Sequence, residues 1–451
     1  MKLPTFRGGI HPPDNKAMAA HKGIETFRPG GELVYPMSQH IGAPCAPIVK
    51  KGDKVLVGQK IGDSEAFVSA PVLSSVSGMV KDVAMRMTVS GAMEQCVIVE
   101  NDGEYKYDAA LLPHKDFKSL EPKECLRIIR EAGIVGMGGA TFPTHVKLSP
   151  PPGKKIRWII VNGAECEPFL NCDNRLMLEQ AEVIVGGLEI CMHLFPEAEG
   201  IIAIENNKPD AIACIQERLS QRNGSMKVIP HEVKYPQGAE KMLIYTVTGQ
   251  EIPPGALPAD VGCLVINVRT LFHIWTAIVD GIPVVDRVIS VVGDVIKTPK
   301  NFLAPLGTSV RELIDAAGGF TEEPAKILSG GPMMGISMRS IDVPVMKGTS
   351  GILALSARSA LHLEESNCIR CGRCVTACPM GLLPSSLDRV VRLREYAEFE
   401  TLGGMNCIEC GSCTYVCPAR RHLTQTCRDG KAGVMAARKK APKAEGKGEK
   451  K

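Results

Sequence analysis

The chain contains the stretch CIRCGRCVTACP at residues 368–379 and repeats its spacing as CIECGSCTYVCP at residues 407–418. Both stretches read C-x2-C-x2-C-x3-C-P, the arrangement that ligates a pair of [4Fe–4S] clusters. Three thiolates of each stretch bind one cluster, and the fourth crosses to the other cluster. The pattern therefore predicts a C-terminal two-cluster, ferredoxin-like α-helical domain that passes single electrons.

The crossing rule divides these cysteines into two ligand sets. The first cysteine set is Cys368, Cys371, Cys374 and Cys417, and the second cysteine set is Cys407, Cys410, Cys413 and Cys378. The alternative is a pair of structural zinc sites. Zinc sites use C-x2-C pairs that are separated by longer stretches, so three close cysteines followed by Cys-Pro favour iron–sulfur clusters.

Length and composition describe an ordinary globular protein with several domains. A chain of 451 residues exceeds what one hydrophobic core supports. The hydrophobic fraction is 44%, the charged fraction 23% and the net charge +4. An aromatic fraction of only 4% argues against stacking on nucleic acid, so we expect no nucleic-acid partner. The Lys-rich residues 431–451 predict a disordered basic tail, either a solubilising end or a contact with anionic lipid.

The sequence shows no sign of export or of a membrane span. No stretch of about 20 apolar residues appears, and the N-terminus has no signal-peptide pattern. Reduced thiols and metal ligation are then expected for the 17 cysteines. Most of the cysteines outside the two sets are predicted to be small core residues.

Residues 31–102 read as short strands that Gly and Pro separate. Alternating Val and Ile runs with Gly-Asp turns suit a small barrel or sandwich. This segment resembles the barrel-sandwich hybrid of biotinyl and lipoyl carriers. Where a carrier has its attachment lysine at a hairpin tip, this chain has Ser77-Gly78-Met79. We therefore expect a docking or scaffolding role and no covalent cofactor.

Residues 121–280 alternate between apolar runs and segments of helical period. This pattern predicts a mostly parallel sheet covered on both faces, with ligands at the carboxyl ends of its strands. Residues 282–340 return to mixed strands with a helix at 309–318, and a further helix is expected at 386–402, between the two Cys runs.

A glycine-rich stretch, GMGGATFPTHVK at residues 136–147, precedes the first long strand of that region. Glycines let backbone N–H groups approach a phosphate, and Lys147 is placed to balance an anion. The stretch matches neither the Walker pattern nor the dinucleotide fingerprint, so a simple tight turn remains the alternative.

Polar residues follow two predicted strands. The strand IRWIIV runs into Asn162, Glu165 and Glu167, and CLVIN ends with Asn267. At strand ends such groups can bond a ring edge or ribose hydroxyls. A polar loop with a helix-capping residue is the alternative. Between the two strands, the segment YPQGAEK supplies Tyr235, Gly238 and Glu240.

Four segments carry a specific resemblance. GMGGATFPTHVK and VNGAECEP look like the glycine-rich and N-A-D-E-x-E-P motifs of the flavin- and NADH-binding subunit of respiratory complex I. YPQGAEK and INVRTL stand where that family has its Tyr/Gly/Glu and N-N-V-E-T-L segments. With the N-terminal barrel and the paired Cys runs, the chain from residue 6 to about 428 resembles the C subunit of Rnf electron-transport complexes.

This resemblance implies a multidomain α/β and α+β fold with a barrel-sandwich hybrid, a Rossmann-like FMN/NADH-binding domain, a β-grasp (SLBB) domain and the ferredoxin-type domain. The expected domains cover residues 1–113, 114–281, 282–345 and 346–430, followed by the tail at 431–451.

The resemblance also implies roles for individual residues. The FMN phosphate is expected at Gly136, Gly138, Gly139 and Lys147. The isoalloxazine and nicotinamide are expected at Asn162, Glu165, Tyr235, Gly238, Glu240 and Asn267, with Glu167 near NADH. The chain departs from the complex I pattern at Met137, Thr141 and Ala164, which replace Arg, Gly and Asp.

The parts predict one activity. NADH gives two electrons as hydride and each cluster accepts one, so a flavin has to stand between them. The resemblance implies a ferredoxin:NAD+ oxidoreductase subunit, peripheral on the cytoplasmic face of the membrane. Integral membrane and ferredoxin-like partner subunits would move Na+ or H+. The alternatives are a soluble cobalamin reductase of the microcompartment type and a non-catalytic iron–sulfur scaffold or redox sensor.

Overall fold

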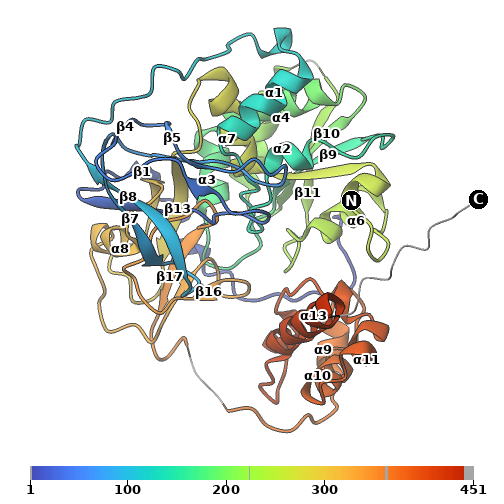
Figure 1. Cartoon of the computed structure of the whole chain (residues 1–451). Helices are drawn as coiled ribbons and strands as arrows, with labels where there is room; N and C mark the ends of the chain where they lie inside the picture. Colours follow the sequence, from blue (N-terminus) through green and yellow to red (C-terminus); the bar gives the residue numbers. More distant parts are fainter. Residues whose placement is uncertain (1–2, 223, 361–363, 441–451) are drawn as a thin grey trace, which may run out of the picture. The chain divides into compact units, whose positions relative to one another are not determined.

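The computed structural model describes residues 3–222, 224–360 and 364–440 (Figure 1). Two compact units make up the chain, and each is described by itself. The first contains residues 12–233 and 237–360 with the start of the chain, and the second contains residues 364–440 together with 6–11 and 234–236. None of the described helices is long and apolar enough to cross a membrane.

Two antiparallel sheets form the N-terminal part of the first unit. The larger has the order β2 (Glu32–Pro36), β8 (Met93–Asn101), β7 (Gly78–Met87) and β4 (Lys54–Val55), and the smaller contains β3 (Ala46–Pro47), β5 (Lys60–Asp63) and β6 (Val72–Leu73). Alternate residues of the larger sheet, such as Leu33, Tyr35, Val97 and Val99, are buried in the large core of the first unit.

Ser77-Gly78 does not form the hairpin tip that we expected. Gly78 begins β7, where it pairs with Asn101, and the tip of the β7–β8 hairpin lies at residues 88–92. The φ of Gly78 is 155°, and a Cβ there would lie 1.9 Å from the Glu100 carbonyl oxygen. Glycine is therefore needed at this position for close strand packing and not for a turn.

The middle of the chain forms the predicted parallel sheet. Its order is β11 (Met226–His231), β10 (Glu199–Glu205), β9 (Trp158–Gly163) and β12 (Cys263–Asn267), all parallel. The helices of this region are η2 (Phe117–Ser119), α1 (Pro122–Glu131), α2 (Thr144–Lys147), α3 (Cys172–Glu179), α4 (Ala181–Leu194), α5 (Pro209–Ser220), α6 (Glu240–Thr248), η3 (Pro258–Val261) and α7 (Val268–Val279).

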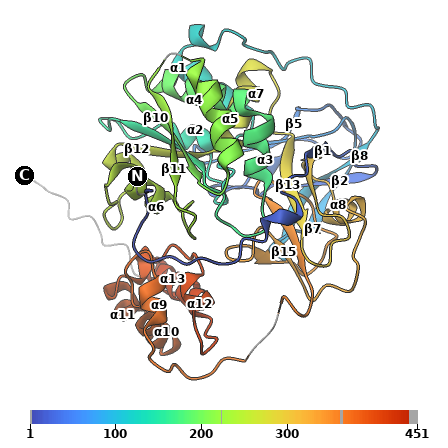
Figure 2. The ribbon, with the colours of Figure 1, turned by 180° about the vertical axis from the view of Figure 1, so that it is seen from behind.

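Residues of β9 alternate between two cores. Ile159 and Val161 belong to the large core, which also holds the apolar faces of α4 and α7. Ile160 faces a smaller core that includes Leu243 and Ile244 of α6. Figure 2 shows α3, α4 and α5 side by side, as their mutual packing requires. Both faces of the sheet are thus covered, so its polar side chains gather at the strand ends.

A six-stranded mixed sheet completes the first unit. Its order is β1 (Ile24–Thr26), β14 (Lys300–Pro305), β13 (Asp286–Val292), β17 (Gly351–Leu355), β15 (Lys326–Ser329) and β16 (Ile336–Ser337), and it carries α8 (Val310–Ala316). Ser309 and Glu312 form a capping box at the start of α8, as expected for a helix in this stretch. β1 lies in the N-terminal segment of the sequence, and η1 (Lys16–Met18) precedes it.

The second unit is helical. It contains α9 (Arg373–Ala377), α10 (Pro384–Arg392), α11 (Tyr396–Thr401), η4 (Gly404–Asn406), α12 (Ser412–Tyr415) and α13 (Leu423–Lys440). Its core includes Leu387, Val390, Phe399 and Val434.

Two expectations about the second unit were wrong in detail. The single helix predicted at 386–402 is two helices, because Arg394 adopts a left-handed φ of 61° that ends α10. Residues 431–440, expected as part of the tail, continue α13, where Val434 is buried and Arg438 pairs with Glu400. The rest of the expected tail lies outside the described residues.

Candidate functional site

The glycine-rich loop closes on itself and presents backbone donors. The N–H of Gly136 donates to the Phe142 carbonyl at 2.8 Å, and Thr141 donates to Gly136 at 3.1 Å. Residues 138–140 between them are exposed, and their N–H groups donate to no atom of the described residues. Gly139 has a φ of 131°, and no atom of the described chain lies within 4 Å of where a Cβ would stand. Consecutive free donors of this kind form an anion-binding arrangement.

Lys147 ends the short helix α2 that follows the loop. Its ammonium group donates to Glu240 at 2.7 Å and to the carbonyl of Val265 at 2.9 Å. Glu240 begins α6, and Val265 lies in β12. The predicted counter-charge for an anion is therefore fixed by a carboxylate that was itself a predicted site residue.

Four predicted residues meet where β9 and β12 end: Gly138, Asn162, Gly238 and Asn267, which we call the strand-end cluster. The Asn162 amide donates to the Gly238 carbonyl at 2.9 Å, and the Asn267 amide donates to the Asn162 carbonyl at 3.3 Å. A Cβ on Gly138 would lie 3.3 Å from the Cβ of Asn267. The loop and both strand ends thus form one site, as the parallel topology predicts.

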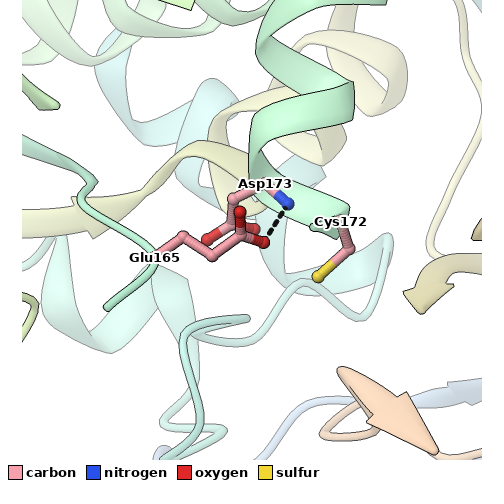
Figure 3. Close-up of side chains that lie close together, drawn as sticks. All are labelled: Glu165, Cys172 and Asp173. Atoms are coloured by element: carbon pink, nitrogen blue, oxygen red, sulfur yellow. Dashed lines mark hydrogen bonds between the residues drawn. The ribbon is translucent and has the colours of Figure 1, made fainter. Parts of the chain in front are cut away.

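Glu165 lies at the N-terminus of α3. Its carboxylate accepts the N–H of Asp173 at 2.7 Å (Figure 3). It also accepts the N–H of Asn174 at 3.2 Å. Burial raises the pKa of the Glu165 carboxyl. Glu165 therefore caps the start of α3, a role that the sequence did not predict, since the capping residue expected in this loop was an Asn or an Asp.

Glu165, Cys172 and Asp173 bring their ligand atoms together as a metal site would (Figure 3). Their partners give a different explanation. Asp173 pairs with Arg269 at 2.5 Å and accepts from Asn267 at 2.9 Å. Burial raises the pKa of Cys172 to about 12, and its thiol donates to the Ser350 carbonyl at 3.4 Å. We therefore interpret these groups as stabilising the starts of α3 and α7.

Glu167 contacts the β-grasp part of the unit. Its carboxylate accepts the N–H groups of Met333 at 3.1 Å and Met334 at 2.8 Å. Burial raises the pKa of Glu167 to about 7. The two backbone N–H donors act in the opposite direction, because they stabilise the ionised carboxylate. The ammonium of the buried Lys16 donates to the Glu167 backbone carbonyl at 2.9 Å. A segment far away in the sequence therefore holds this loop.

Tyr235 belongs to the second unit, unlike the other predicted flavin-site residues. Its hydroxyl donates to the carbonyl of Cys410 at 2.7 Å, and its backbone pairs with Ile10. The motif that contains Tyr235 and Gly238 therefore passes from one unit into the other.

Sequence reasoning missed several buried charged residues around the strand ends. Arg269 pairs with Asp173, and Lys208 pairs with Glu205 at 3.2 Å and donates to the Ala164 carbonyl at 2.7 Å. Glu205 is the last residue of the buried strand β10, and Arg269 follows the buried strand β12. A charged residue at such a position could have indicated a buried ion pair near the strand ends. Nothing local in the sequence indicates that Lys16 reaches this site.

The second cysteine set surrounds one cavity. Its four members line the cavity together with Cys427, Ser412 and Thr424. The N–H of Glu409 donates to the Cys407 sulfur at 3.4 Å. The Ser412 hydroxyl lies 3.4 Å from the Cys410 sulfur, and that of Thr424 lies 3.7 Å from the Cys413 sulfur. Converging thiols with nearby donors fit a [4Fe–4S] cluster, whose ligands are thiolates that accept hydrogen bonds.

The first cysteine set is more open. Cys368 and Cys371 are exposed, Cys417 is half-buried and Cys374 is buried. Helices α9 and α12, which carry parts of both Cys runs, pack against each other. Ser366 donates to the Ala419 carbonyl at 3.0 Å, which brings the residues before the first run beside those after the second.

Comparison with known proteins identifies four successive domains. The matches are the RnfC barrel sandwich hybrid domain at 4–104, the Nuo51 FMN-binding domain at 129–276, the SLBB domain at 288–337 and the 4Fe-4S dicluster domain at 360–421.

Curated relatives cover most of the chain. The C subunit of the proton-translocating ferredoxin:NAD(+) oxidoreductase complex of Clostridium ljungdahlii is 48% identical over 386 residues, 86% of this chain and 84% of the relative. Its counterpart in the Na(+)-translocating ferredoxin:NAD(+) oxidoreductase complex of Acetobacterium woodii is 44% identical over 440 residues, 98% and 99% of the two chains. The chain belongs to the RnfC family, the C subunits of ion-translocating oxidoreductase complexes.

A third RnfC relative, the C subunit of the ion-translocating oxidoreductase complex of Rhodobacter capsulatus, is 41% identical over 85% of this chain and 74% of its own. The family and the domain order confirm the predicted resemblance and fold class. The FMN-binding and dicluster domains confirm FMN and [4Fe–4S] clusters as the cofactors of this RnfC chain.

Proposed function

We propose that this chain exchanges hydride between NAD(H) and FMN and relays electrons singly through two [4Fe–4S] clusters, as part of a ferredoxin:NAD+ oxidoreductase complex. The observation that carries the proposal is the glycine-rich loop: Gly138 lies against Asn267 at the carboxyl end of the parallel sheet, and the N–H groups of residues 138–140 donate to no described atom. The cysteine cavity on the same chain supplies the one-electron partner.

The proposal assigns a role to each predicted residue. Gly136, Gly138, Gly139 and Lys147 hold the FMN phosphate; Asn162, Gly238, Glu240 and Asn267 bind the rest of the flavin. Glu165, whose carboxylate caps α3, and Tyr235 line the isoalloxazine and the nicotinamide, and Glu167 lies near NADH. Bound FMN would supply the chemistry of hydride acceptance and single-electron release.

The proposal includes the complex around the chain. The names of the relatives attribute proton or Na+ translocation to their complexes. We assign ion movement to integral membrane partners and electron exchange to a ferredoxin-like partner. The chain would be peripheral on the cytoplasmic face of the membrane. Domain boundaries near residues 113, 281 and 345 and the ligand sets given above belong to the same proposal.

The Lys147→Met variant tests the flavin site. Loss of the ammonium group is expected to weaken FMN binding about tenfold or more, because a charge-assisted bond to a phosphate contributes roughly 1.5–3 kcal/mol. FMN affinity and NADH-dependent reduction of an artificial one-electron acceptor would be measured under anaerobic conditions. Lys326→Met, at an exposed lysine of β15, is the matched control. NADH oxidation without any flavin requirement in the parent protein would contradict the proposed function.

A further inference from the structure

Arg287 lies fully buried beneath the glycine-rich loop. It belongs to β13 of the six-stranded sheet, and its side chain is 0% exposed. Its Nη2 donates to the carbonyl of Met137 at 3.0 Å, and its Nε donates to the carbonyl of Thr349 at 2.8 Å. Nη1 points to the sulfur of Met137. All three acceptors are uncharged.

The surroundings leave the Arg287 charge without a matching anion. No carboxylate lies within ion-pair distance of Arg287 in the part of the chain that the structure describes. Arg269, also buried, is already paired with Asp173. Lys347 is fully buried as well, and its ammonium donates to the carbonyls of Pro71 and Gly133.

Burial lowers the pKa of Arg287, and the neighbouring Arg269 lowers it further. Burial also lowers the pKa of His273 to about 3, so that side chain is neutral and adds no charge. An arginine nevertheless stays protonated in proteins. A buried, uncompensated cation is costly, which favours binding of an anion close to it.

The bond to Met137 also orients the loop. In a trans peptide the C=O of one residue and the N–H of the next point in opposite directions. Because Arg287 holds the Met137 carbonyl on the buried side, the Gly138 N–H is directed to the opposite side. Gly138, Gly139 and Ala140 are exposed there, with N–H groups that donate to no described residue.

We propose that Arg287 is the positioning residue of the phosphate site: it turns the Gly138 N–H outward and supplies the positive charge beneath the loop that an anionic phosphate requires. The proposal rests on FMN binding at this loop. It gives the β-grasp domain a part in cofactor binding, because that domain contributes the counter-charge from β13.

The test compares FMN with riboflavin, which has the same ring system but no phosphate. Flavin-free full-length protein would be titrated with each ligand, and binding followed by quenching of flavin fluorescence. The variants are Arg287→Met, which removes donor and charge, and Arg287→Lys, which keeps a charge. Arg311→Met is the matched control, because Arg311 lies in the same domain but is exposed and pairs with Asp342.

We expect Arg287→Met to weaken FMN binding about tenfold or more and to change riboflavin binding less than twofold. Arg287→Lys is expected to restore much of the preference for FMN, and Arg311→Met to behave like the parent. Equal weakening of both ligands, or unchanged FMN affinity, would overturn the role of Arg287. If Arg287→Met binds neither ligand, Arg287→Gln replaces it, and the same FMN-to-riboflavin ratio decides.

The parent protein separates this inference from the proposed function. A parent that binds FMN and riboflavin equally has no phosphate site at the loop, and the proposed function fails with it. A parent that prefers FMN, with an Arg287→Met variant that keeps the preference, refutes only the inference.

Discussion

At the strand ends of the parallel sheet, polar side chains hold one another, whereas in the second unit backbone and hydroxyl donors surround sulfur atoms. Asn162, Asn267 and Asp173 form a chain of bonds that fixes the strand-end cluster. The second cysteine set instead converges on a cavity, with Ser412 and Thr424 beside it. The first region depends on partners spread along the whole chain, and the second on a local spacing of ligands.

The largest effect is expected from removing a cluster ligand. Cys410→Ala and Cys371→Ala should each lose about one cluster, that is, about half of the iron. Cys410 is buried and Cys371 exposed, so only Cys410→Ala should also lower the thermal midpoint of the second unit clearly. Iron analysis and calorimetry check both results.

Equal loss of stability in the two cysteine variants would contradict the distinction between an enclosed and an open set. Cys214→Ala provides the control, because Cys214 belongs to neither set and lies in the first unit.

A smaller effect, on the pH dependence of stability, is expected from Glu167 in the loop that follows β9. Burial raises the pKa of Glu167 from 4.5 to about 7. Between these two pH values the folded protein keeps the Glu167 carboxyl protonated, whereas the unfolded chain releases the proton. Stability from this group is full below pH 4.5 and falls as the pH rises to about 7, by at most about 3 kcal/mol.

Glu167→Gln should flatten this pH dependence. Chemical denaturation of the parent and the variant between pH 4.5 and about 8 measures it. Glu322→Gln, at an exposed position of the same unit, is the control. If the free energy of unfolding of Glu167→Gln and of the parent changes with pH in the same way, the pKa of the Glu167 carboxyl is not raised in the folded protein.

The smallest effect concerns the potential of one cluster. In the structure the Cys410 thiol donates to the Ser412 hydroxyl at 3.4 Å. Once the sulfur is a thiolate ligand, the hydroxyl would donate to it, so Ser412→Ala removes a donor from the reduced, more negative cluster. A hydrogen bond worth roughly 0.5–1.5 kcal/mol corresponds to a fall in potential on the order of 20–60 mV. EPR-monitored redox titration measures it, with Thr401→Val on the exposed face of α11 as control. An unchanged potential, or a shift in the other cluster, would contradict the ligand assignment.

The two regions also differ in how far the sequence predicts them. The cysteine spacing predicts the cluster ligands because three cysteines two residues apart can bind one cluster through local chain geometry alone. The parallel sheet and the strand-end residues followed from apolar runs that end in polar residues. Glu165 as a helix cap, Lys16 behind Glu167 and Arg287 beneath Met137 were not predicted, since each depends on a contact across more than 100 residues or on the exact start of a helix.

Local conformation accounts for the remaining errors. The left-handed Arg394 divides a helix whose periodicity continues across the break, and apolar contacts of Val434 extend α13 into the basic segment. The break at Arg394 and the length of α13 both depend on tertiary packing in the second unit, which amino-acid composition does not predict.

The most direct test of the relay is an anaerobic NADH titration of the protein reconstituted with FMN and iron–sulfur clusters, followed by optical and EPR spectra on one sample with iron and FMN quantified. The account predicts flavin bleaching and then two interacting signals from reduced clusters. Clusters that dithionite reduces but NADH does not, in a sample with full FMN content, would contradict it.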